Sequence, residues 1–158
     1  MNALSRKHIL ALIAVMSFGA VGIALVSQYV YDMPPCAWCV FQRLIYLVLG
    51  TVALIGLFGA GALSRVCAAL STPIALGGML AAWYQFSVAA EMESCDQTFA
   101  DQFMVKSGLD GNFPSLFGIF ATCMDAKVAV FGVEYALWSL ALFAILAVLG
   151  VVALRRKA

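Results

Sequence analysis

The residues most able to do chemistry in this chain are two cysteines with two residues between them, Cys36 and Cys39, and an arginine, Arg43, one helical turn further on. They lie in the segment PPCAWCVFQR, directly before a long apolar stretch. A disulfide between Cys36 and Cys39 closes too short a loop to stabilise a fold strongly. An arginine at the edge of a hydrocarbon layer is costly. The combination therefore favours redox chemistry over a structural role.

Local sequence predicts that this motif opens a helix. Pro34 and Pro35 suit the entry to a helix but cannot continue a preceding one. Cys36 and Cys39 are then expected in the first turn, where free N–H groups and the helix dipole favour an anionic thiolate. Arg43 follows on the same face as Cys39 and adds positive charge. The alternative for Arg43 is an interfacial side chain whose charged head only reaches water.

The position of the motif also restricts the electron acceptor. A thiol at the end of a membrane helix faces the lipid, so its acceptor must be reachable from the bilayer, and a quinone meets this requirement. Arg43 is then expected to stabilise the thiolate and the negative charge of the reduced acceptor. The chain contains no G-x-G-x-x-G or G-x-x-x-x-G-K nucleotide-binding motif. Its single histidine, His8, lies near the other side of the membrane, which excludes histidine as the base at this motif.

The elements that must position these residues are four apolar segments, each long enough to cross about 30 Å of hydrocarbon as a helix. Of the 158 residues, 65% are hydrophobic and only 11% are charged, far from the composition of soluble domains. We expect one all-α membrane domain over residues 1–158, a four-transmembrane-helix bundle. Its spans are predicted at about residues 9–30, 40–60, 66–90 and 133–154. The first is interpreted as a retained span, because its apolar run is too long for a signal peptide and no small-residue cleavage site follows.

Charge predicts the orientation of these spans. Basic residues gather near both termini and between the second and third spans, on the side that the positive-inside rule assigns to the cytoplasm. They are Arg6, Lys7, Arg65, Arg155, Arg156 and Lys157. The eight acidic residues fall on the opposite side or at its edge. Both termini are therefore expected in the cytoplasm, and two loops, at about residues 31–39 and 91–132, in the outer compartment.

This topology sorts the five cysteines. Cys36 and Cys39 belong to the first outer loop and Cys95 and Cys123 to the second, whereas Cys67 lies on the cytoplasmic side as a buried thiol without a role. Three interpretations of the outer four are open: two structural disulfides, a zinc site with four cysteine ligands, or a relay of two exchanging disulfides. We favour the relay, because a Cys-x-x-Cys bridge stabilises little and the second pair lacks the close spacing of zinc ligands.

The second outer loop carries apolar residues at i, i+3, i+4 and i+7 over residues 113–120, which predicts a short amphipathic helix. This helix either packs on the end of the bundle or lies at the membrane interface. In both positions it holds Cys123 near the membrane surface, where Cys123 can approach Cys36. Cys95 lies in a more polar stretch and is better placed to meet a soluble partner.

Together, these features resemble the DsbB family of disulfide bond formation proteins, which reoxidise the thioredoxin-fold oxidase DsbA of the bacterial periplasm. PCAWCVFQR is similar to the family's Pro-Cys-x-x-Cys-x-x-x-Arg segment, and VFGVEYALW, residues 130–138, resembles its entry to the fourth helix. The resemblance covers nearly the whole chain. It implies a thiol:quinone oxidoreductase of the bacterial inner membrane, with ubiquinone or menaquinone as acceptor, a periplasmic DsbA-like partner and no nucleic acid ligand.

The resemblance also implies a role for each outer cysteine. Cys95 and Cys123 form the disulfide that the reduced partner attacks, with Cys95 entering the mixed disulfide. Cys123 then attacks Cys36 and frees Cys39, which donates electrons to the quinone beside Arg43.

Two other functions are open. One is a vitamin K epoxide reductase-like enzyme, although the position of the motif at the start of the second span argues against it. The other is a tetraspanning protein with structural disulfides. Some members of the DsbB family have a histidine near the quinone, and the third span here has none. Gln85 in that span is interpreted as a residue that hydrogen-bonds between helices.

Overall fold

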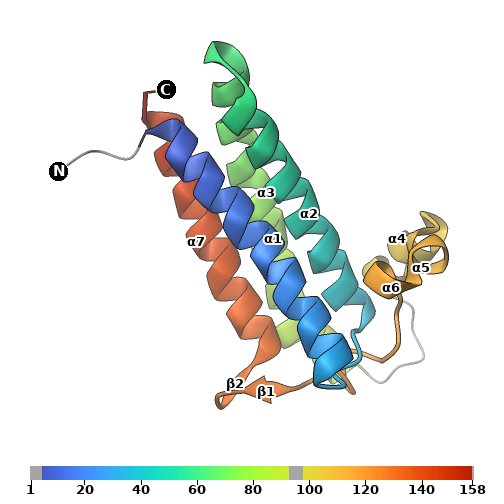
Figure 1. The fold of residues 1–158 in the computed structure, drawn as a ribbon. Helices are drawn as coiled ribbons and strands as arrows, with labels where there is room; N and C mark the ends of the chain where they lie inside the picture. Colours follow the sequence, from blue (N-terminus) through green and yellow to red (C-terminus); the bar gives the residue numbers. More distant parts are fainter. Residues whose placement is uncertain (1–4, 93–97, 158) are drawn as a thin grey trace.

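The structure is a computed structural model that describes residues 5–92 and 98–157, and four long helices dominate it. Their bounds are Arg6–Val30 for α1, Ala37–Phe58 for α2, Gly61–Ser87 for α3 and Tyr135–Arg155 for α7. All four are long and apolar enough to cross a membrane, which confirms the predicted all-α bundle of four spans. In Figure 1, α1 begins and α7 ends at the same end of the bundle. There the Arg6 N–H donates to the Lys157 carbonyl over 3.2 Å.

Small residues allow these helices to approach one another closely. α2 packs against both α1 and α3, and α3 packs along α7. The ring of Phe143 leaves no room for a Cβ at Gly78, and a Cβ at Gly56 would lie 2.6 Å from the Cβ of Cys67. Phe143 also stacks on Tyr46, with ring centroids 4.0 Å apart. Cys67 is therefore a buried packing residue between α2 and α3.

Two helices begin away from the edges of the apolar segments. α3 starts at Gly61 and not near residue 66, because backbone hydrogen bonding continues through the polar residues that hydropathy excludes. α7 starts at Tyr135 because a short hairpin precedes it, in which β1, Ala129–Val130, pairs with β2, Val133–Glu134. The two residues of its turn, Phe131 and Gly132, both have positive φ, as the tightest hairpin turns require. Sequence reasoning did not predict this hairpin.

In its described residues, the loop between α3 and the hairpin contains a 3₁₀ turn and three short helices. They are η1 at Ala89–Glu91, α4 at Phe99–Lys106, α5 at Leu109–Asn112 and α6 at Pro114–Phe117. Figure 1 shows α4, α5 and α6 beside the first turns of α2. The longest of them, α4, begins with a capping box formed by Thr98 and Asp101.

The short helix expected over residues 113–120 is present, but it covers only Pro114–Phe117. The α6 helix ends after one turn, and the chain becomes extended at Gly118. The N–H groups of Phe120 and Ala121 then donate to the carbonyl of Pro35, over 3.0 and 3.3 Å, and not to a preceding turn. A contact with a distant part of the chain therefore overrides the local helical pattern and places this segment against the cysteine motif.

Candidate active site

The two cysteines of the motif lie at the N-terminal end of α2. Cys36 is the N-cap residue and Cys39 lies in the first turn, with their Sγ atoms 3.0 Å apart. Cys36 is fully buried, whereas Cys39 lines a cavity. The expected preference for a thiolate is wrong for Cys36: burial, together with its contacts to Cys123 and Cys39, raises the pKa of the Cys36 thiol well above its ordinary value. Cys36 therefore keeps its proton at neutral pH and is a poor nucleophile when reduced.

Cys123 comes from the second loop and contacts Cys36. The backbone bonds to Pro35 bring the segment just before Cys123 to the start of α2. Cys123 packs against the apolar cluster that contains Cys36, and it lies near enough to contribute to the raised pKa of the Cys36 thiol. Cys36 thus has one sulfur from its own helix and one from the distant loop beside it. The fourth predicted cysteine, Cys95, lies outside the described residues.

No metal site is evident in the described part of the chain. Across residues 5–92 and 98–157, no three side chains among His, Cys, Asp and Glu are grouped so that they could hold a metal ion. The other two described outer cysteines, Cys39 and Cys123, both pack against the cluster that contains Cys36.

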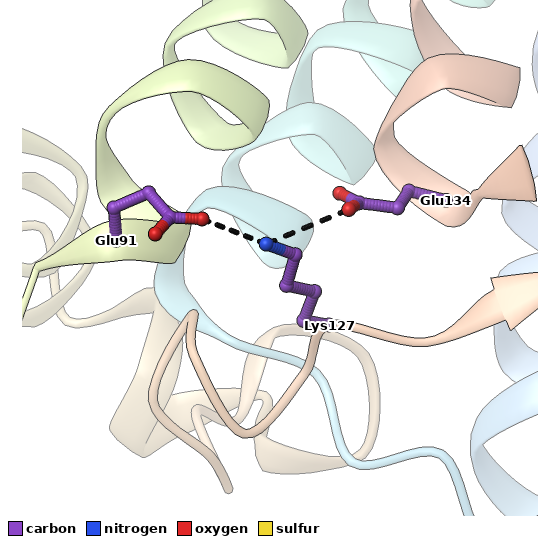
Figure 2. A network of polar contacts seen from close by, with 3 residues as sticks. All are labelled: Glu91, Lys127 and Glu134. Carbon is purple, nitrogen blue, oxygen red and sulfur yellow. Dashed lines mark hydrogen bonds and ion pairs between the residues drawn. The ribbon is translucent and has the colours of Figure 1, made fainter.

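An ion-pair network holds the chain just after Cys123 (Figure 2). Lys127 Nζ lies 2.7 Å from Glu91 Oε1 and 3.5 Å from Glu134 Oε1. Glu91 follows α3 and Glu134 directly precedes α7, so that Lys127 joins the ends of two spanning helices. The hydrogen bond with Glu91 raises the pKa of Lys127, which keeps the ammonium charged. The Cys123 segment is thus fixed at Pro35 on one side and at Lys127 on the other.

We expect Lys127→Met to slow thiol exchange between Cys123 and Cys36 by about two- to fivefold. The effect should be small because exposed ion pairs contribute little energy, and it should be measurable because these pairs restrain the loop that carries Cys123. The exchange is measured by rapid acid quenching and peptide mapping of the Cys36–Cys123 disulfide. Lys127→Arg, which keeps the charge, serves as the control. Raised salt should slow the wild type toward the rate of Lys127→Met, because screening weakens exposed pairs. An unchanged rate in Lys127→Met would mean that the bonds to Pro35 alone position Cys123.

A cavity of about 560 Å³ opens beside Cys39, between α1, α2, α7 and the hairpin. Its walls are mostly apolar, with Ile23 of α1, Val130 of β1 and Leu142 of α7 among them. Its few polar side chains are Arg43, Gln42, Gln85, Tyr46, Ser27, Ser139, Tyr135 and Trp138. An apolar cavity with a few convergent polar groups is typical of a site for a small organic molecule.

Arg43 is buried among these helices. Nη1 donates to Gln28 Oε1 over 2.7 Å and to the Leu116 carbonyl over 3.0 Å, and Nη2 donates to the Ala24 carbonyl over 3.3 Å. The guanidinium therefore connects α1, α2 and α6, and the alternative of an interfacial arginine that reaches water is wrong. The Arg43 Nε is buried and has no hydrogen-bond partner among the described residues.

A chain of hydrogen bonds leads away from Cys39 across α2, α3 and α7. Gln85 Nε2 donates to Cys39 Sγ over 3.2 Å, and Gln42 Nε2 donates to Gln85 Oε1 over 2.5 Å. Ser139 Oγ donates to Gln42 Oε1 over 2.6 Å, and the Tyr46 hydroxyl lies 3.0 Å from Ser139 Oγ. The interpretation of Gln85 as a helix–helix hydrogen-bonding residue is confirmed. Sequence reasoning missed the other three, although polar residues inside an apolar span were the available signal.

Comparison with known proteins shows a family match that includes all the residues of this site. The family model described as disulfide bond formation protein DsbB matches residues 6–153. A disulfide bond formation protein B of Ralstonia nicotianae is 33% identical over 158 residues, which cover 99% of this chain and 98% of that protein. Disulfide bond formation protein B 1 of Pseudomonas savastanoi is 32% identical over 146 residues, 91% of this chain and 86% of that protein. A disulfide bond formation protein B of Dechloromonas aromatica is 29% identical over 149 residues, 89% of this chain and 88% of that protein.

Proposed function

Because the chain belongs to the DsbB family of disulfide bond formation proteins, we propose that this multi-pass membrane protein is a thiol:quinone oxidoreductase that reoxidises a DsbA-like partner. Electrons pass from the dithiol of the partner, through two cysteine pairs, to a membrane quinone. One arrangement carries the proposal: the sulfur of Cys36 lies 3.0 Å from that of its helix neighbour Cys39, and the loop cysteine Cys123 packs against the same cluster. Two disulfides can exchange only where sulfurs from both pairs meet.

The first exchanges load the partner's electrons onto the protein. A thiolate of the reduced partner attacks Cys95 of the Cys95–Cys123 disulfide, which forms a mixed disulfide and releases Cys123. Cys123 attacks Cys36 of the Cys36–Cys39 disulfide, and Cys39 leaves as a thiolate. Each exchange forms one S–S bond and breaks one. Since burial raises the pKa of the Cys36 thiol, Cys39 is the favoured leaving sulfur at this bond.

The last exchanges restore the outer pair. The partner's second thiol attacks the partner's own sulfur in the mixed disulfide, so that the oxidised partner departs and Cys95 is released. Cys95 then attacks Cys123 of the Cys36–Cys123 disulfide and releases Cys36. The Cys95–Cys123 disulfide is restored, and the two electrons of the partner now reside on Cys36 and Cys39 as a dithiol.

The cavity beside Cys39 fits a quinone as the electron acceptor. The volume of about 560 Å³ and the apolar walls of this cavity suit the substituted ring of a quinone. Arg43 lines this cavity and brings a buried positive charge to it. Ubiquinone or menaquinone supplies a two-electron, two-proton acceptor there. The positive charge of Arg43 favours the thiolate of Cys39 and any negative charge that develops on the acceptor.

We propose the bacterial inner membrane as the location, with both termini cytoplasmic and the cysteine end in the periplasm. Arg6, Arg65 and Lys157 surround a second cavity at the end of the bundle where α1 begins. Positive charge at that end is typical of the cytoplasmic side. Disulfide exchange with a secreted partner requires the oxidising side of the membrane, which supports the opposite end as the periplasmic one.

The test combines the purified protein in detergent with a reduced DsbA-like protein and a ubiquinone or menaquinone analogue. Quinone absorbance and free thiols of the partner are followed together. We expect one quinone to be consumed for each partner disulfide formed. Folded protein that leaves both unchanged would contradict the proposal and favour structural disulfides. Reduction of a vitamin K epoxide with a dithiol, without oxidation of the DsbA-like protein, would favour the reductase-like alternative.

A further inference from the structure

We propose that Gln85 is a catalytic residue whose amide N–H stabilises the anionic sulfur of Cys39, and that Gln42, Ser139 and Tyr46 hold this amide in the required orientation. The inference deepens the proposed function and rests on it for the moment at which Cys39 carries charge. Gln85 provides a hydrogen-bond donor from α3, the helix whose sequence contains no histidine.

The argument begins with the two ends of the Gln85 amide. Its NH₂ group donates hydrogen bonds, whereas its carbonyl oxygen accepts them, and a thiolate is stabilised only by a donor. Rotation of the amide by half a turn would exchange the two ends. Gln42 prevents this exchange, because its Nε2 donates to Gln85 Oε1 over 2.5 Å. The carbonyl is thereby occupied, and Nε2 of Gln85 remains for Cys39 Sγ, 3.2 Å away.

The same reasoning applies one step further along the chain. The Gln42 amide presents its NH₂ to Gln85 because its own carbonyl accepts from Ser139 Oγ over 2.6 Å. The Tyr46 hydroxyl donates to the Ser139 carbonyl over 3.2 Å and lies 3.0 Å from Ser139 Oγ, so that it holds Ser139 in place. The bonds from Ser139, Gln42 and Gln85 each donate toward Cys39. Bonds aligned in this way strengthen one another in a low-dielectric interior.

The far end of the chain is fixed by packing. Tyr46 is buried and stacks on Phe143, with an interplanar angle of 6°. Phe143 in turn fills the space that Gly78 leaves open on α3. The orientation of the Gln85 amide is thus anchored in the core of the bundle and does not depend on the outer loops.

Burial makes this chain more than an ordinary contact between helices. Gln42 and Gln85 expose only 4% and 6% of their surface, and a buried amide is costly unless it is hydrogen-bonded. The Gln42–Gln85 bond alone would join α2 to α3. The additional bond from Gln85 ends on Cys39, the sulfur that lines the cavity proposed for the quinone.

The deciding experiment measures the reactivity of Cys39 in the fully reduced protein without any quinone. Iodoacetamide is applied in short pulses between pH 6 and pH 9, and alkylation of Cys39 and Cys123 is quantified by mass spectrometry of their peptides. Gln85→Glu keeps the size of the side chain but places a carboxylate opposite the sulfur. We expect it to slow alkylation of Cys39 at pH 7 at least about tenfold, the scale of a hydrogen bond to a charged group. The rate at Cys123, which Gln85 does not contact, should be unchanged.

Two further variants separate the chemical role from a structural one. Gln42→Glu cannot donate to Gln85, so the Gln85 amide becomes free to turn, and we expect a smaller loss of Cys39 reactivity, of about threefold. Ser139→Ala removes the donor to Gln42 and should also lower the reactivity of Cys39. If Gln85→Glu does not fold, this variant tests the same inference. Equal Cys39 alkylation in Gln85→Glu and wild type, or equal slowing at Cys39 and Cys123, would overturn the inference.

The readout also keeps the two proposals distinct. Because alkylation needs neither partner nor quinone, a wild type without quinone turnover would defeat the proposed function and leave this measurement intact. Normal turnover in the wild type, with unchanged Cys39 alkylation in Gln85→Glu, would defeat the role of Gln85 alone.

Discussion

Cys39→Ser is expected to lower quinone reduction by the reduced partner to the background rate while the four-helix bundle stays folded. A serine hydroxyl neither forms a disulfide nor is an anionic donor at neutral pH, so the inner pair no longer exists. The released Cys123 thiol then has no Cys36–Cys39 disulfide to attack. The relay should therefore stop at the mixed disulfide between the partner and Cys95, which is expected to accumulate as the trapped intermediate.

The measurement follows quinone absorbance for turnover and non-reducing peptide mapping for the trapped disulfide. Cys67→Ser is the matched control, since Cys67 packs against Gly56 between α2 and α3 and takes no part in the relay. It should keep wild-type turnover. Quinone reduction by Cys39→Ser at the wild-type rate would mean that another sulfur donates the electrons, and the assignment of the cavity beside Cys39 would then be withdrawn.

The second large effect is expected from Arg43→Met, which should raise the apparent KM for quinone by about ten- to a hundredfold. Methionine preserves much of the apolar stem but removes the charge and all five donors of the guanidinium. The acceptor in the cavity loses its cationic partner. Three acceptors within the protein also lose their hydrogen-bond donor, namely Gln28 Oε1 and the carbonyls of Ala24 and Leu116.

The loss of those three bonds makes a stability control necessary. Thermal unfolding in detergent without quinone reports how far Arg43 holds α1, α2 and α6 together. Kinetics at a temperature well below the transition then report on quinone binding. Arg43→Lys keeps the charge but not the planar fork, so we expect an intermediate KM. A variant Arg43→Met with unchanged KM and a lowered transition temperature would reduce Arg43 to a structural residue.

The local features of the chain follow from its sequence. Hydrophobic length alone predicted the four spans, because a helix must satisfy its own backbone groups inside hydrocarbon whatever its neighbours are. Pro34 and Pro35 predicted the start of α2 at the cysteine motif, because proline restricts only the chain immediately around it. The family could also be inferred, since the Cys-x-x-Cys-x-x-x-Arg spacing and the second cysteine pair are properties of the linear chain.

Tertiary structure decided what surrounds the sulfurs. The pattern over residues 113–120 predicted a helix, but the carbonyl of Pro35 captures this segment and thereby carries Cys123 to Cys36. Burial raised the pKa of Cys36 where the helix start alone favoured a thiolate. Neither effect is visible locally, because each depends on groups far away in the sequence.

The polar interior of the bundle shows the same division. An arginine and two glutamines inside apolar spans are evident in the sequence, but their partners are not. The bonds of Arg43 to α1 and α6, and the chain that runs from Tyr46 to Cys39, exist only after α1, α3 and α7 have packed around α2. The sequence determined which residues are able to do chemistry, and the packing of the helices determined which atoms they meet, since hydrogen bonds require distances and directions that only the folded chain supplies.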